Sequence, residues 1–171
     1  MQRLRQGSRA LLAFTQPVDE ALVETYLSPE QRRLFRRMRH SEQLHSVSVL
    51  QAVLAQEATT PHALAVAALL HDVGKSRYKL MVWQKTIAVL VKKFAPGLFE
   101  RLNTNEPTHW WQIPFAVRTH HPAWGAAMAA AANTDDVALW LIAHHQDTPA
   151  QWRNHPHYAL LKRLQLADDA N

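Results

Sequence analysis

The 171-residue sequence contains no cysteine and only four glycines. Without cysteine there is no disulfide framework and no thiolate metal site, so a bound metal would need histidine or carboxylate ligands. The absence of cysteine also fits a protein of a reducing compartment. The scarcity of glycine, beside abundant alanine and leucine, favours helices over a strand-rich fold.

Long apolar runs are also absent. No segment approaches the roughly 20 apolar residues that span a bilayer, and no apolar core of a signal peptide follows the basic residues 1–5. We therefore expect a soluble, cytoplasmic protein. A hydrophobic content of 47% excludes a mainly disordered chain. The length favours one domain over residues 1–171, with residues 1–40 as an N-terminal helical extension.

Helical periodicity runs through most of the chain, and the patterns typical of strands are scarce. Ser28, Pro29 and Gln31 form a capping box with proline at the first helical position, which predicts a helix start. Gly74 is expected to end a buried central helix as its C′ residue. The sequence thus predicts an all-α bundle with helices at 18–27, from 29 onward, and at 41–57, 61–71, 78–94, 113–120, 122–132, 135–145 and 156–167.

Two basic segments invite a functional interpretation. The helix that begins at Pro29 carries five arginines between residues 32 and 39. A solvated basic face is favoured there over contact with nucleic acid, because no aromatic platform accompanies the arginines. Residues 78–94 form an amphipathic, moderately basic helix with Trp83, Ile87 and Leu90 on one side. A membrane-surface role is conceivable for it, but a helix packed into the domain is favoured.

Titratable groups that interrupt apolar helix faces are the most informative feature. Asp168 continues the stripe that contains Leu164, and His144 lies on the stripe of Trp140. A carboxylate on a core face is costly unless it is paired, protonated or metal-bound. Metal-capable groups at or near buried faces occur on five predicted helices: His45, His71, Asp72, His121, His144, His145 and Asp168. By themselves His71 and Asp72 could equally cap a helix end, but the whole set favours a metal site.

Three blocks resemble the HD-domain metal-dependent phosphohydrolase superfamily: His45-Ser46, residues 71–75 (HDVGK) and residues 167–171 (ADDAN). The resemblance covers about residues 43–171 and implies a compact multi-helix HD-domain bundle. Residues 121–126 (HPAWGA) and the doublet His144-His145 are similar to blocks of the HDIG-type and HD-GYP-type branches. Several of these blocks are separated by about 23–26 residues, which is roughly the length of one helical hairpin.

The resemblance implies a divalent-metal centre of one or two ions. The ligands of the first ion would be His45, His71, Asp72 and Asp168. A second ion would be held by His121, His144 and His145, with Asp72 as the bridge. The spacing to Pro122 and Gly125 favours His121 over its neighbour His120. Fe or Mn is favoured, and Mg, Ni, Co and Zn stay open.

The resemblance also implies the reaction. A metal-bound hydroxide would attack a phosphomonoester, phosphodiester or phosphoanhydride bond of a phosphorylated small molecule, in particular a nucleotide or dinucleotide. Asp72 and Lys75 are the expected catalytic residues. Lys75 is also expected to contact a phosphate, with Arg77 and Arg118 as weaker substrate-binding candidates, and the alternative for Lys75 is an ordinary exposed lysine. The net charge of +5 is consistent with an acidic ligand.

The segment after His145 departs from one branch of the superfamily. It reads Gln146-Asp147-Thr148-Pro149 instead of the Gly-Tyr-Pro block of cyclic di-GMP phosphodiesterases, which argues against that substrate. The compact size and residues 121–126 also resemble bacterial symmetrical dinucleoside tetraphosphate hydrolases. A non-catalytic HD-fold sensor that binds metal or nucleotide is the alternative function. Nucleic acid is not an expected partner, and a homodimer stays open.

Overall fold

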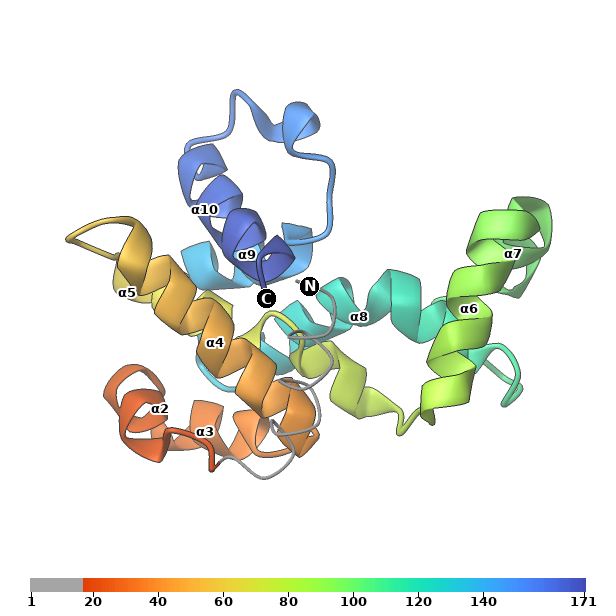
Figure 1. Cartoon of the computed structure of the whole chain (residues 1–171), viewed down its shortest axis with the longest axis horizontal. Coiled ribbons are helices and arrows are strands. Elements are labelled where there is room, and N and C mark those ends of the chain that lie inside the picture. The colour runs from red at the N-terminus through yellow and green to blue at the C-terminus, as the bar shows by residue number, and fades with distance from the viewer. Residues whose placement is uncertain (1–16) are drawn as a thin grey trace, which may run out of the picture.

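The computed structural model describes residues 17–171, which form an all-helical bundle without a strand in that range (Figure 1). The all-α prediction is confirmed. Residues 1–16, part of the predicted N-terminal extension, lie outside the described range. The elements are α2 (Glu20–Tyr26), α3 (Pro29–Phe35), α4 (His40–Gln56), α5 (His62–Leu70), η1 (Val73–Arg77), α6 (Val82–Phe94), α7 (Pro96–Leu102), α8 (Ile113–Ala130), α9 (Asp136–His144), η2 (Pro149–Trp152) and α10 (Tyr158–Asp169).

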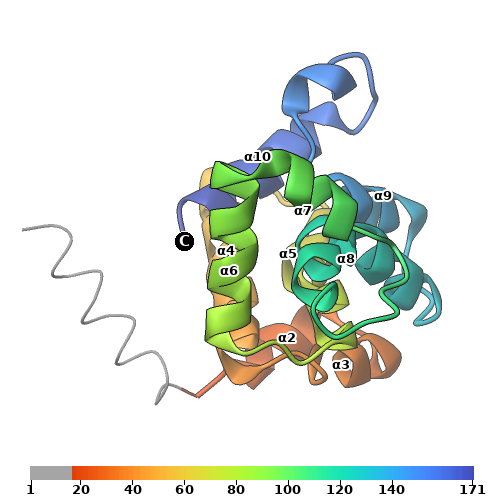
Figure 2. The same cartoon turned by 90° about the vertical axis from the view of Figure 1, so that its right-hand side faces the viewer.

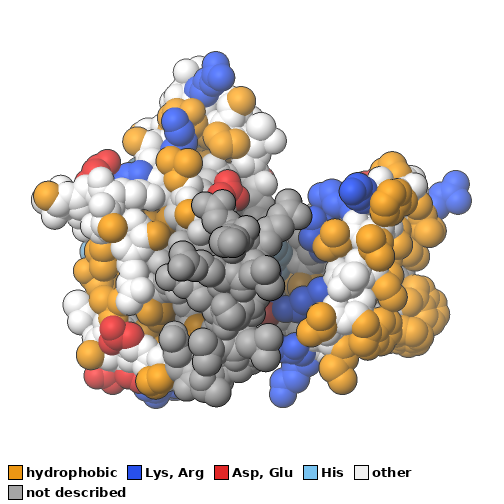
Figure 3. Space-filling view, in the orientation of Figure 1, with side chains coloured by type: hydrophobic (Ala, Val, Ile, Leu, Met, Phe, Trp, Pro, Cys, Tyr) orange, Lys and Arg blue, Asp and Glu red, His pale blue; other side chains and the backbone are white. Residues whose placement is uncertain are grey.

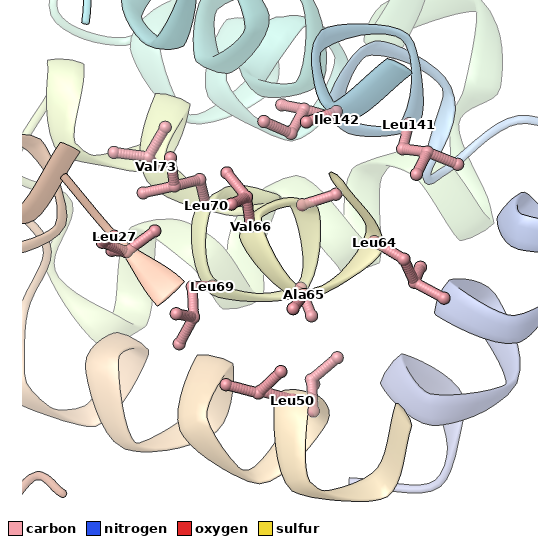
Figure 4. Close-up of a cluster of buried hydrophobic side chains, with 14 of the residues drawn as sticks. Leu27, Leu50, Leu64, Ala65, Val66, Leu69, Leu70, Val73, Leu141 and Ile142 are labelled. Carbon is pink, nitrogen blue, oxygen red and sulfur yellow. The ribbon is translucent and has the colours of Figure 1, made fainter. Parts of the chain in front are cut away.

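Helix α5 lies at the centre of the bundle. All of its residues from Leu64 to Leu70 are buried, as expected for a helix that is apolar nearly all round. It packs against α4, α9 and α10. Figure 4 shows Leu50 of α4 on one side of α5 and Ile142 of α9 on the other. Because full burial of one such side chain contributes about 1.5–3 kcal/mol, this core holds the end of α5 in place.

The predicted capping box at the start of α3 is confirmed. The backbone N–H of Gln31 donates to the Ser28 hydroxyl at 3.3 Å, and the Ser28 N–H donates to Gln31 Oε1 at 3.0 Å. The Gln31 amide also donates to the Thr134 hydroxyl, which ties α3 to the connection between α8 and α9. The helix expected to carry five arginines ends at Phe35, so only Arg32 and Arg33 lie within α3. Arg32 and the following Arg36 pair with glutamates of α2.

The predicted boundary between two helices at residues 120–122 is wrong. The helices expected at 113–120 and 122–132 are one continuous helix, α8, with Pro122 inside it. Proline removes one hydrogen bond from a helix interior, and packing of α8 against η1 and α9 keeps the helix intact. The predicted helix at 78–94 ends at Phe94, as expected, and Pro96 takes an early position of the next helix, α7, where its missing N–H costs nothing.

Helix α6 differs most from its prediction, since the expectation that it packs into the domain fails for its apolar side. Ala88 is its only buried residue, whereas Trp83, Ile87 and Leu90 are exposed. Trp110 and Trp111 are exposed too. Within residues 17–171, no helix combines the length and hydropathy needed to cross a bilayer. The cytoplasmic location stays a prediction.

A buried arginine fixes the last helix onto the bundle. Arg163 of α10 donates to Gln56 Oε1 at 3.1 Å, to Glu57 Oε2 at 2.9 Å and to the Thr60 hydroxyl at 3.0 Å. These partners lie at the end of α4 and in the connection to α5. The network therefore holds α10 against α4, and α10 carries Asp168.

Candidate metal centre

The segment that follows α5 brings two polar side chains into the core. Helix α5 ends at Leu70, and both His71 and Asp72 are buried before η1 begins at Val73. The predicted role of Gly74 as a left-handed C′ residue is wrong, because no glycine among the described residues has a positive φ. A Cβ at Gly74 would overlap the His121 carbonyl oxygen and lie 2.7 Å from the Gly125 nitrogen. Glycine is therefore needed so that η1 can lie directly on α8.

Three buried histidines are held in one orientation by the backbone. The Nδ1 atoms of His71, His121 and His145 lie 2.8–2.9 Å from the carbonyl oxygens of Ala68, Val117 and Ile142, respectively. A carbonyl only accepts, so each Nδ1 must carry the proton and each Nε2 keeps a free lone pair. All three Nε2 atoms are buried without a hydrogen-bond partner. Backbone-oriented imidazoles of this kind are typical metal ligands.

Asp72 lies between these histidines and uses its two oxygens in different directions. Oδ1 is 3.3 Å from His121 Nε2 and 3.7 Å from His145 Nε2. Oδ2 is 3.6 Å from His71 Nε2 and 2.5 Å from Lys75 Nζ. A carboxylate placed in this way can contribute one oxygen to each of two neighbouring sites.

The remaining predicted ligands lie at the open side of His71. His45 of α4 and Asp168 of α10 contact each other, with 2.9 Å between Nε2 and Oδ1. The same oxygen of Asp168 is 3.6 Å from His71 Nε2. Two groups of candidate ligands follow, in each of which the ligand atoms lie within 4.8 Å of one another. One group is His45, His71 and Asp72, and the other is Asp72, His121 and His145.

The electrostatics favour the protonation states that metal binding requires at Asp72, Asp168 and His145. For His71, burial lowers the pKa but the neighbouring Asp72 and Asp168 outweigh it, so the pKa is raised. Burial alone would raise the pKa of Asp72, but His71, His121 and Lys75 outweigh it and hold the pKa well below its usual value. Burial likewise opposes ionisation of Asp168, yet the hydrogen bond with His45 and the neighbouring His71 lower its pKa. For His145, burial and the charges of His71 and His121 lower the pKa to about 3. The carboxylates are thus ionised and His145 is neutral near pH 7.

A metal ion fits this arrangement of donors. The three unpartnered imidazole nitrogens meet one buried carboxylate, and burying such groups without a ligand is costly. Nitrogen and carboxylate donors without a thiolate suit divalent ions of the first transition row and Mg²⁺. In the comparison with protein families, the model described as HD domain matches residues 43–170.

The chain belongs to the HD domain family. The match spans 128 of the 171 residues and confirms the resemblance inferred from the sequence blocks. The family is one of metal-dependent phosphohydrolases. Neither a curated protein nor a solved structure matched the chain.

The structure of this HD domain separates the neighbouring histidines that the sequence left together. His121 contacts Asp72, whereas His120 is half-buried beside the Trp124 ring, with 5.9 Å between the centroids. In the doublet, His145 belongs to a ligand group, and His144 does not. His144 Nδ1 instead lies 2.7 Å from Asp147 Oδ2.

Two pockets border the ligand groups of the HD domain. The α9–α10 pocket has a volume of about 450 Å³, and its lining includes Arg118, His145, Gln146, Lys162 and Asp168. The α6–α8 pocket has a volume of about 200 Å³, and its lining includes Lys75, Lys85, Lys92, Arg118, His121 and Gln146. Arg118 and Gln146 line both pockets, so the two adjoin at these residues. Each pocket also reaches a candidate ligand, His145 and Asp168 in the first and His121 in the second.

Two of the three predicted substrate-binding residues line the pockets, and the third does not. Lys75 and Arg118 line the pockets, while the exposed Arg77 guanidinium covers the Trp124 ring at 4.6 Å from its centroid. The sequence interpretation missed Lys85 and Lys92. Their spacing of seven residues puts both on one helix face and was a usable signal. Lys162 was also missed, and no local pattern distinguishes it from other exposed lysines.

Proposed function

We propose that this HD domain hydrolyses a phosphate ester or anhydride bond of a nucleotide or dinucleotide. The observation that carries the proposal is the position of Asp72. Its two oxygens face two groups of histidines, and three of these histidines present buried, unpartnered Nε2 atoms. A carboxylate shared between two metal ions is the arrangement used for in-line displacement at phosphorus.

The chain offers enough ligands for two divalent ions. His45, His71 and Asp72 would hold one, with Asp168 beside them. Asp72, His121 and His145 would hold the second. The sequence also nominates His144, but its bond to Asp147 supports a role in the wall of the site instead of in the ligand set. Fe or Mn stays the favoured metal, and the donor set also admits Mg, Ni, Co or Zn.

The chemistry divides between the metal and the residues around it. A divalent ion held by these ligands would lower the pKa of a water ligand and offset negative charge on the phosphoryl group. Asp72 aligns the two groups of ligands. Lys75, whose ammonium lies 2.5 Å from Asp72 Oδ2, supplies a cation next to the reacting phosphate and balances the buried carboxylate.

The cations of the two pockets support a substrate with several phosphates. Lys75, Lys85, Lys92 and Arg118 line the α6–α8 pocket, and Lys162 stands in the α9–α10 pocket. Neither pocket is lined by cations alone: Val89 and Pro114 are in the first, and Pro149 and Leu166 in the second. A nucleotide polyphosphate or dinucleotide has a charged phosphate chain next to less polar groups, and so matches a lining of cationic and apolar side chains.

Metal analysis combined with an activity panel tests the proposal. Purified protein should carry close to two ions per chain and hydrolyse at least one member of a panel of nucleotides, dinucleoside polyphosphates and cyclic dinucleotides. Asp72→Ala should lose both ions and the activity. Asp19→Ala removes the exposed N-cap of α2, which is distant in sequence from the proposed ligands, and should keep both the ions and the activity. Metal binding without hydrolysis of any panel member would instead assign the chain a sensor role, and full activity of Asp72→Ala would exclude the mechanism.

A further inference from the structure

The large exposed apolar side chains among the described residues gather in one stretch of the chain. Within residues 17–171, eleven large hydrophobic side chains are exposed, and ten of them fall between Met81 and Trp111. Leu166 is the exception. Figure 3 shows hydrophobic side chains over the outer side of the lobe formed by α6 and α7. A concentration of this kind marks a surface that is covered by something in the working protein.

Helix α6 presents its apolar stripe outward and its lysines inward. Trp83, Ile87, Leu90 and Phe94 follow each other at spacings of four, three and four, so they share one face. All four are exposed, Phe94 by 73%. Lys85 and Lys92 lie on the opposite face and line the α6–α8 pocket. Figure 3 agrees, with cationic side chains on the side of this lobe that faces the rest of the molecule.

Within residues 17–171, a small apolar core and the ion pair between Lys85 and Glu42 of α4 attach α6 and α7 to the bundle. Ala88, Phe99 and Phe115 form the core, with Val91 and Leu102 packed against them. This core is separate from the main one around α5. In Figure 1 the two helices stand apart at the end of α8, and in Figure 2 they face the viewer. The apolar stripe of α6 therefore lies on an outer face of the protein, open to a large flat partner.

The lobe formed by α6 and α7 has a net positive charge. Residues 81–102 contain four cations and the single acid Glu100. Two of the cations, Lys85 and Lys92, face the α6–α8 pocket, and Lys85 pairs with Glu42 at 2.9 Å. Lys93 and Arg101 are therefore the cations left for the outer side. Lys93 lies at the border of the stripe, with its ammonium 5.3 Å from the Phe94 ring centroid. A second copy of this face would bring the cations Lys93 and Arg101 of both copies together against only Glu100 of each, which is destabilising. Anionic headgroups would neutralise them.

We propose that α6 and α7 bind the surface of an anionic phospholipid membrane, with α6 lying in the plane of the interface. The apolar stripe would enter the boundary between headgroups and acyl chains, while Lys93 and Arg101 contact lipid phosphates. The tryptophans suit this position, because an indole ring places its apolar body in lipid and its N–H in water. Lys85 and Lys92 stay turned toward the α6–α8 pocket, so membrane binding leaves that pocket's cations in place.

Vesicle flotation of the full chain tests the membrane surface. The protein should float with vesicles of equimolar phosphatidylcholine and phosphatidylglycerol, and should bind vesicles of phosphatidylcholine alone several-fold less. The double variant Leu90→Gln/Phe94→Gln should partition about tenfold less or lower, since two side chains no longer enter the apolar layer. Lys93→Gln/Arg101→Gln should lose the preference for phosphatidylglycerol. Leu166→Gln, which removes an exposed leucine of α10 outside the face, should bind as the wild type does.

Each variant is compared with the wild type for thermal unfolding and metal content. If the double variant unfolds, the single variant Trp83→Gln replaces it, and its binding to vesicles should also be reduced. Loss of flotation in the stripe variants with retention in Leu166→Gln supports the proposal. Absence of wild-type flotation, or unchanged flotation of the stripe variants, overturns it. A wild-type dimer in sedimentation that Leu90→Gln/Phe94→Gln dissolves, without vesicle binding, would assign the face to a second copy of the chain.

Discussion

The backbone of Gly74 lies directly against the carbonyl of His121, with no room for a side chain between them. This contact joins η1 to α8 at the point where Asp72 and His121 approach to 3.3 Å. The spacing of the proposed second metal site therefore depends on a glycine that coordinates nothing. Gly125 completes the contact on α8, since its nitrogen lies near the same position.

Gly74→Ala should disrupt the second metal site. The added methyl group must push η1 away from α8, which we expect to cost about 1–3 kcal/mol of unfolding free energy. Urea denaturation and metal analysis measure the two effects. Gly97→Ala is the matched control: an added Cβ there meets nothing within 4 Å, and alanine suits α7, so stability should be equal or slightly higher. A Gly74→Ala protein with wild-type stability and metal content would contradict the close contact.

His145→Ala and His144→Ala should differ. His145 offers a buried, unpartnered Nε2 next to Asp72, so its loss should remove one of two ions and most of the activity. His144 is bonded to Asp147, so its loss should keep both ions and lower activity by no more than the about 10–100-fold typical of outer contacts. Metal content per chain distinguishes the two variants. The opposite result would return His144 to the ligand set.

Lys92→Ala should weaken substrate binding without affecting the chemical step. The lysine lines the α6–α8 pocket but contacts no proposed ligand. Because a hydrogen bond to a charged group contributes roughly 1.5–3 kcal/mol, KM for a polyphosphate substrate should rise about tenfold or more, with kcat nearly constant. Lys79→Ala removes an exposed lysine that lines neither pocket, and its KM should stay unchanged. Equal KM values for both variants would argue against phosphate contact in this pocket.

Arg163→Met should loosen α10 and with it the first metal site. The variant loses the hydrogen bonds to Gln56, Glu57 and Thr60, which we expect to cost about 1–3 kcal/mol in unfolding free energy. Metal affinity should fall as well, because α10 carries Asp168 next to His45. Lys162→Met, at an exposed neighbouring position, should stay within about 0.5 kcal/mol of the wild type. Unchanged metal affinity would show that the hydrogen bonds of Arg163 do not contribute to metal binding.

Local patterns in the sequence were sufficient for most helices and for the chemistry of the ligands. The capping box of Ser28 and Gln31 and the apolar run of α5 depend on neighbours within one or two turns, so they can be recognised without a fold. The absence of cysteine restricted the donors to histidine and carboxylate. The ordered blocks from His45 to Asp168 identified the family before any contact was known.

Only the tertiary structure decided how these residues meet. The spacing of neighbours in sequence cannot tell His145 from His144, because burial against Asp72 comes from the packing of α9 on α8 and α5. Sequence spacing also could not show that Gly74 makes a close contact instead of a turn, or that α8 continues across Pro122. Both features depend on packing against another part of the chain. For α6 the predicted apolar face exists, but it faces the solvent and not the core. Periodicity defines an apolar face, and only the arrangement of the other helices determines whether that face meets the core or the solvent.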